Sequence, residues 1–293
     1  MLIQISPSIF LVEGENEGRF PFSHSILIRD KITVLIDTGC GLERLERIRE
    51  KYRPDLVLNS HIHPDHSAGN WLFEGVPLLV PREGFGISGQ LLKMSERFTE
   101  PGELAQEWRD YVREAMGFQE IGPTHDYEDG RRFRFGAVEL VAIHSPGHAS
   151  DHYCLFEPRR KILFSFDIDL AAFGPWYGHR ESNVELFEAS VRRVQALHPR
   201  IVVSSHLGII SDRIDERFEA YLNIISRREE QILRFLSQER RLEEMVDQAL
   251  IYGGFPYAPA LLRYWEGQML QKHIHRLIEK GLILERDGAY IRA

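Results

Sequence analysis

Hydrophobic residues in the first part of the chain fall into short runs separated by polar turns. Runs such as 24–29 and 32–37 predict β-strands, and the short polar link between them predicts a hairpin. Residues 42–52 carry apolar side chains at helical spacing and end before Pro54, which predicts a helix. Further strands are predicted at 2–12, 56–59, 76–80, 133–143 (a hairpin bent at Gly136), 153–157, 162–166 and 201–204, and further helices from about 65 and at 184–197. Two similar successions of strands and helices indicate two packed sheets flanked by helices.

Residues 84–118 differ from the segments on either side. They are amphipathic and helical in pattern, with Met94, Phe98, Trp108 and Tyr111 among their apolar positions. A stripe of Met and aromatic residues at helical spacing is more often core than ligand site. We therefore expect an insertion that packs over the candidate site around residues 61–66, with a contact in a homodimer as the alternative.

From about residue 212 the strand pattern stops. A long helix is predicted as far as 237, followed by helices at 242–251 and 268–280 and by two short strands within 282–292. This order is typical of a winged helix, so we expect a domain boundary near 225, with 1–225 as the catalytic domain and 226–293 as a C-terminal domain. The tail from 226 onward has eleven basic and ten acidic residues. Because nucleic-acid binding usually needs a basic excess, packing or dimerisation is the favoured role of the tail.

Composition narrows the class of protein. The chain has 293 residues, of which 43% are hydrophobic and 27% are charged, and this is typical of a soluble globular protein. The net charge of −8 offers no general attraction for nucleic acid or a membrane surface. No apolar run approaches the roughly 18 residues of a transmembrane helix, and the N-terminus lacks the pattern of a signal peptide. With two cysteines, Cys40 and Cys154, a cytoplasmic location is the expectation.

Four residues of metal-ligand type lie together directly after the predicted strand 56–59. They are His61, His63, Asp65 and His66. Two imidazoles two positions apart on a loop can point at one ion, and the Asp and His that follow can turn towards a second. Imidazole nitrogens combined with carboxylates suit Zn²⁺ first, and Fe and Mn also accept them. The cluster therefore predicts a metal site.

Three later residues complete the predicted site. His148, Asp167 and His206 each follow a predicted strand, so they should arrive at the same sheet edge as His61. Seven ligands are what two ions about 3.5–4 Å apart require when they share a carboxylate and a water. We therefore predict two divalent metal ions as cofactors.

These segments, in this order, resemble the metallo-β-lactamase superfamily over roughly residues 8–210. The resemblance rests on Ile36-Asp37-Thr38-Gly39, His61-x-His63-x-Asp65-His66, Pro146-Gly147-His148, Phe164-Ser165-Phe166-Asp167 and Ser205-His206. It implies an α/β fold of the αββα sandwich type. It also implies a first metal held by His61, His63 and His148, a second held by Asp65, His66 and His206, and Asp167 as the bridge. Phe166 stands where the family usually has Gly, which makes Asp169 a weaker candidate for the bridge.

The predicted mechanism is attack by a hydroxide that bridges the two metals. Asp65 can orient this hydroxide and later pass a proton to the leaving group. In the loop 173–179, Tyr177 is a candidate donor to a developing oxyanion, with ordinary loop packing as an equal alternative.

Several residues beside the site have supporting roles as the favoured hypothesis. Asp37 is expected to hold a metal-bound imidazole rather than merely to shape a turn. His24, His144 and His152 are expected to be hydrogen-bonded structural residues, and binding of substrate by Asp151 and His152 is a minority alternative.

The substrate is less well defined than the reaction. The sequence Pro146–His152 and the predicted winged-helix tail resemble the glyoxalase II-related branch, which also includes lactamase-like endoribonucleases. Because the chain is acidic, a small ester, thioester or lactone ranks first, and a phosphodiesterase or endoribonuclease is the alternative. A nucleic-acid-binding regulator with a metal sensor site is a hypothesis from another class, and the full set of ligands counts against it.

Overall fold

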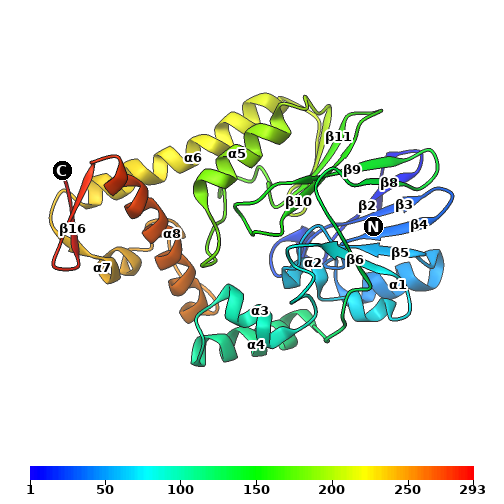
Figure 1. Cartoon of the computed structure of the whole chain (residues 1–293), viewed down its shortest axis with the longest axis horizontal. Coiled ribbons are helices and arrows are strands. Elements are labelled where there is room, and N and C mark those ends of the chain that lie inside the picture. Colours follow the sequence, from blue (N-terminus) through cyan, green and yellow to red (C-terminus); the bar gives the residue numbers. More distant parts are fainter.

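Two β-sheets pack face to face at the centre of the computed structural model, which describes residues 1–293 (Figure 1). The first sheet has seven strands in chain order, β1 (Leu2–Ser6), β2 (Ile9–Val12), β3 (Ser25–Arg29), β4 (Thr33–Ile36), β5 (Leu56–Leu58), β6 (Leu78–Pro81) and β7 (His125–Tyr127). The second has six strands, ordered β13 (Gly208–Ile210), β12 (Ile201–Ser204), β11 (Ile162–Phe166), β10 (Tyr153–Glu157), β9 (Glu139–His144) and β8 (Arg132–Arg134).

The central strands of each sheet are buried on both faces, which explains why they are continuously hydrophobic. In β3, Ile26 and Ile28 face the core between the sheets, whereas Leu27 packs on the opposite face. In β11, Phe164 faces the other sheet and Leu163 packs outward. Successive side chains of a strand point to opposite faces, so each sheet needs a helical layer on its outer side.

Helices supply these outer layers. Near the first sheet lie the 3₁₀ turns η1 (Glu15–Gly18) and η2 (Asn70–Phe73) and the helices α1 (Leu42–Tyr52), α2 (Pro64–Ser67), α3 (Leu91–Phe98) and α4 (Glu103–Met116). The outer face of the second sheet packs on α5 (Val184–Gln195) and on the first half of α6 (Ile214–Phe235) (Figure 1). The layers thus follow the αββα order that the resemblance implied. No helix is both long enough and apolar enough to cross a membrane.

The C-terminal part has a small core of its own. It contains α7 (Leu242–Asp247), α8 (Pro259–Glu279) and a three-stranded sheet ordered β14 (Arg240–Arg241), β16 (Ala289–Arg292) and β15 (Ile283–Arg286). The end of α6 packs into this core through Ile232, whereas Ile225 packs against the second sheet. The first half of α8 reaches back to α4, where Leu262 joins the core under the first sheet. The division at 225 and the winged-helix assignment stay predictions.

Several predicted elements needed correction. Residues 2–12 form two antiparallel strands rather than one, because the chain turns at Pro7 and Ser8. Helix α8 begins at Pro259 rather than at 268. Strands β7 and β13 were not predicted, since both are short and β7 carries mainly polar residues. The other predicted strands and helices are present within a few residues of their expected bounds.

Candidate metal centre

The segment 61–66 follows β5 and leads into α2. Pro64 occupies the first turn of α2, where its missing N–H is not needed. Gly39, at the end of β4, allows this segment to approach closely, because a Cβ atom there would lie 1.5 Å from the carbonyl oxygen of Asp65. The same carbonyl accepts a hydrogen bond from Ser23 Oγ at 2.6 Å. Contacts within the chain therefore fix the backbone of this segment without the help of a ligand.

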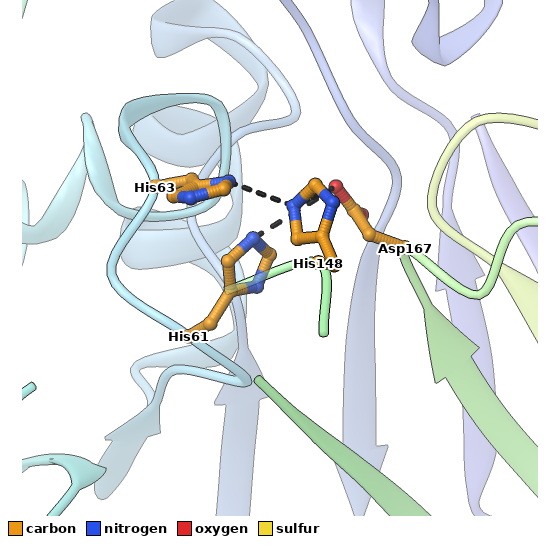
Figure 2. Close-up of side chains that lie close together, drawn as sticks. All are labelled: His61, His63, His148 and Asp167. Atoms are coloured by element: carbon orange, nitrogen blue, oxygen red, sulfur yellow. Dashed lines mark hydrogen bonds and ion pairs between the residues drawn. The ribbon is translucent and has the colours of Figure 1, made fainter. Parts of the chain in front are cut away.

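A first group of donor atoms comes from His61, His63, His148 and Asp167 (Figure 2). All four side chains are buried, and their donor atoms lie within 4.8 Å of one another. The Nε2 atom of His148 lies 2.9 Å from Nδ1 of His63 and 3.1 Å from Oδ2 of Asp167. His61 Nε2 lies 3.8 Å from the same carboxylate oxygen.

A second group comprises Asp65, His66, Asp167 and His206, again within 4.8 Å. His66 Nε2 lies 2.9 Å from Oδ1 of Asp167, and His206 Nε2 lies 3.6 Å from it. Asp65 Oδ2 lies 3.7 Å from Nε2 of His66 and 3.6 Å from Nε2 of His206. Asp167 thus directs Oδ2 to the first group and Oδ1 to the second. The structure brings all seven predicted residues together.

The donor set fits divalent cations. His61 Nε2, His66 Nε2 and Asp167 Oδ1 are buried and make no hydrogen bond within the chain. A buried polar atom without a partner costs about 1–3 kcal/mol, so several of them pointing at one another are a costly arrangement for a chain alone. Cations bound between these nitrogen and oxygen atoms would satisfy them.

Four of the five imidazoles contact a second polar group through their other ring nitrogen. These contacts join His61 Nδ1 to Ser60 Oγ (3.0 Å), His66 Nδ1 to Asp37 Oδ2 (2.8 Å), His148 Nδ1 to the Trp176 carbonyl (3.0 Å) and His206 Nδ1 to the Gly18 carbonyl (2.7 Å). Such contacts orient the ring and leave Nε2 free to face the centre. His63 is the exception, because its outer nitrogen Nε2 has no hydrogen-bond partner.

Burial and mutual repulsion shape the protonation of the centre. Burial, reinforced by neighbouring histidines, holds the pKa of His61 and His63 well below the usual value, so both rings are neutral. Burial alone would also lower the pKa of His206, but Asp167 and Asp65 raise it to about 9. Burial raises the pKa of Asp65, while His66, His148 and His206 hold the pKa of Asp167 well below its usual range despite burial. Neutral imidazoles and an ionised Asp167 are the forms that ligate metals, so a cation would have to displace the proton that His206 holds in the metal-free chain.

Phe166 stands where the family usually has glycine, and its backbone shows what this substitution requires. It adopts a left-handed backbone conformation, with φ of 49°, at a register shift between β11 and β12. Glycine adopts this conformation without strain, and another residue pays about 1–2 kcal/mol. The turn nevertheless forms, and the N–H of Asp167 donates to Nε2 of His152 at 3.2 Å. Asp169 belongs to neither group and accepts from the N–H of Ala171 at 3.0 Å instead.

The structure places the hydroxyl of Tyr177, the predicted oxyanion donor, away from the donor groups. Its side chain is fully buried, and its hydroxyl lies 2.7 Å from Nε2 of His273 and 2.9 Å from Nη1 of Arg228. Both partners come from the C-terminal part of the chain, so the hydroxyl is engaged there rather than directed at the donor groups.

His24, His144 and His152 are hydrogen-bonded structural residues, as predicted. Their partners are the Gly14 N–H for His24 Nδ1, the Ser150 carbonyl for His144 Nε2, and the Ser145 carbonyl and Asp167 N–H for His152.

Arg97 is a supporting residue that the sequence did not reveal. It lies on α3, and its Nη2 contacts Asp151 Oδ1 at 2.7 Å. Asp151 is fully buried, and its other oxygen accepts from the N–H of Ile62 at 2.9 Å. The carboxylate is therefore occupied by the protein, which leaves no atom for the substrate contact considered as an alternative. The insertion is thereby fastened to the ligand segment. In the sequence, the only indication of this role is that an arginine occurs within the amphipathic pattern of α3.

A groove of about 280 Å³ opens beside Asp65. Its wall includes three carboxylates, Glu15, Glu43 and Glu114, together with the end of α4. Near it, Tyr111 of α4 stacks on Phe20 with ring centroids 6.1 Å apart. Burial, with smaller effects of Tyr257 and Asp65, raises the pKa of Tyr111 to about 12, so its hydroxyl stays protonated. Asp65 is the one residue of the seven that lines this groove.

Comparisons with known proteins agree with this architecture. A family model described as the metallo-beta-lactamase superfamily matches residues 18–206. The atrochrysone carboxyl ACP thioesterase of Aspergillus terreus is 28% identical over 253 residues, which cover 82% of this chain and 67% of that protein. The acyl-coenzyme A thioesterase MBLAC2 of Homo sapiens is 32% identical over 157 residues, which cover 46% of this chain and 53% of that protein.

A solved structure extends the similarity to the whole fold. The crystal structure of a metallo-beta-lactamase family protein from Thermus thermophilus superposes with a TM-score of 0.77 at 21% identity. The match covers 99% of this chain and 100% of that chain, so it includes the C-terminal part.

Proposed function

Because this chain belongs to the metallo-beta-lactamase superfamily, we propose that it is a hydrolase that uses two divalent cations to cleave thioesters of small acyl groups. The observation that carries this proposal is the position of Asp167, which offers one carboxylate oxygen to each of two groups of buried donor atoms. The similarity to proteins named as acyl carrier protein and acyl-coenzyme A thioesterases favours a thioester among the small substrates.

The two groups of donor residues would each hold one cation. His61, His63 and His148 would hold the first, Asp65, His66 and His206 the second, and Asp167 both. Zinc is the first choice for this donor set, with iron and manganese as alternatives. Cations bound there supply Lewis acidity, which lowers the pKa of water towards neutrality and polarises a carbonyl oxygen.

Asp65 is the residue that we propose to move protons. It borders the groove and lies beside the other donor atoms of the second group. A carboxylate at such a position can accept a proton from water and return it to the departing thiolate. Its place between His66 and His206 keeps the carboxylate directed at the centre.

The charge of the chain counts against a long polyanionic substrate. The net charge is −8, and Glu15, Glu43 and Glu114 line the groove beside Asp65. A long polyanion such as RNA would be repelled by this charge. The phosphodiesterase hypothesis therefore ranks below the thioesterase hypothesis.

The test compares substrates with and without metal. Purified protein is assayed on S-acyl-N-acetylcysteamine thioesters, p-nitrophenyl esters and bis(p-nitrophenyl) phosphate, before and after chelation and after re-addition of zinc. Thioester cleavage should be fastest, should be lost on chelation and should return with zinc. His63→Ala should abolish it, whereas His125→Ala, at an exposed histidine far from the donor groups, should leave it intact.

Faster phosphodiester cleavage would replace the thioester assignment with the phosphodiesterase. Salt-sensitive DNA binding without metal-dependent turnover would favour the regulator and end the enzyme proposal.

A further inference from the structure

The segment 173–179 touches two residues of the first donor group, and it is called the strap below. The carbonyl oxygen of Trp176 lies 3.0 Å from Nδ1 of His148. The ring of His179 lies 4.6 Å from that of His63, with the planes at 85°. One short segment therefore borders both His148 and His63.

His63 depends on this contact more than the other imidazoles depend on their neighbours. Its Nδ1 atom contacts His148, but its Nε2 atom is buried without a hydrogen bond, so packing alone holds the outer side of the ring. The ring stands nearly perpendicular to Phe98 and His179, at 4.8 and 4.6 Å, and these two rings stack on each other at 4.3 Å. A shift of the strap would therefore release the ring of His63.

The strap is held in place by residues that follow the predicted boundary at 225. The buried guanidinium of Arg228, on α6, donates to the carbonyls of Phe173 (2.6 Å) and Pro175 (2.5 Å). Trp176 Nε1 donates to the hydroxyl of Tyr252 at 2.6 Å. Lys272, on α8, donates to the carbonyl of His179 at 2.7 Å.

The second donor group has no such connection. Its outer contacts come from the N-terminal part of the chain, where Asp37 holds His66 and the Gly18 carbonyl holds His206. In the first group, His61 is also supported from the N-terminal part, through Ser60 and Asp37. His148 and His63 are therefore the ligands that the strap supports.

We propose that the C-terminal part positions the ligands of the first cation through the strap, with Arg228 and Tyr252 as the positioning residues. The inference rests on the proposed function, since it assumes that both groups bind cations. It assigns the tail a role in the metal site itself, beyond packing or dimerisation.

The experiment measures zinc retained per chain against graded concentrations of a chelator. Wild-type protein is compared with Arg228→Met and with Tyr252→Phe, which removes one hydroxyl and keeps the ring. Each variant should bind one of its two zinc ions at least tenfold more weakly and the other unchanged. Cobalt substituted at the weakened site should show an altered visible absorption spectrum.

Arg276→Met is the matched control. Arg276 is another arginine at the same junction, where it pairs with Glu188 and Glu229 and does not touch the strap. It should retain both ions like the wild type. Wild-type retention by folded Tyr252→Phe and Arg228→Met would overturn the inference, and so would an equal loss in Arg276→Met. A wild-type protein that binds no metal would instead overturn the proposed function.

Discussion

Asp37 Oδ2 lies 2.8 Å from Nδ1 of His66, and both side chains are fully buried. Asp37 follows β4 in a left-handed conformation, with φ of 58°, which directs its carboxylate across to the neighbouring strand. There it also accepts from the N–H and the hydroxyl of Ser60, each at 2.7 Å. The carboxylate thereby keeps the proton of His66 on Nδ1 and turns Nε2 towards Asp167.

Replacing Asp37 by Ala should weaken binding of the second cation about 10–100-fold, because His66 loses the group that orients it. It should also lower the free energy of unfolding by about 1–3 kcal/mol, since the Ser60 N–H is left buried and unpaired. Isothermal titration with zinc and urea denaturation measure the two effects. Asp55→Ala removes a comparable contact to the Thr33 N–H far from the centre and should leave zinc affinity unchanged.

Asp167→Asn should abolish turnover and reduce the bound zinc, because a neutral amide cannot offer a charged oxygen to both groups. A loss of about 10³-fold or more in kcat/KM is expected when an electrostatic element of this kind is removed. Asp169→Asn is the matched control, since this neighbouring carboxylate belongs to neither group. Equal losses in the two variants would show that the bridge has been assigned to the wrong residue.

Arg97→Met should be strongly destabilising. It leaves the fully buried carboxylate of Asp151 without its ion pair, and breaking a buried pair costs about 3–5 kcal/mol. Urea denaturation at saturating zinc measures this cost. Arg82→Met, which removes an exposed ion pair with Asp126, should cost less than about 1 kcal/mol. A similar small cost at Arg97 would mean that the insertion is not fastened through this pair.

Glu229 should make stability depend on acid pH. Burial alone would raise its pKa, but the nearby His273, the hydrogen bond from Lys280 and the charge of Arg276 lower it from 4.5 to about 2. The folded state therefore holds the ionised form more strongly than the unfolded state does. This stabilisation is complete above pH 4.5 and is lost as the pH falls from 4.5 towards 2.

Glu229→Gln should accordingly be about 1–2 kcal/mol less stable than wild type at pH 7, after allowance for screening by solvent. The difference should stay constant down to about pH 5 and shrink below it. Urea denaturation of the metal-free proteins across this range provides the measurement. Glu230→Gln, at an exposed neighbouring position, should follow the wild type throughout. A difference that grows on acidification would contradict the assignment.

Most of the strands along the chain and the seven donor residues were predictable because both are encoded locally. A short apolar run forms a strand wherever it is buried, and the residue after it emerges at the edge of the sheet. His61, Asp167 and His206 each follow such a run, so their convergence could be anticipated without coordinates.

The support of these residues depended on contacts between distant segments. Three of these contacts join residues that are far apart in sequence: Arg97 with Asp151, Trp176 with Tyr252, and Tyr177 with Arg228. No periodic pattern in the sequence predicts them. Tyr177 in particular looks suited to an exposed loop, and only the packing of α6 and α8 turned its hydroxyl away from the donor groups. Hydrophobic spacing specifies which face of an element is buried. It does not specify which distant residue will bond to a polar side chain on that face, because this depends on how the layers pack against one another.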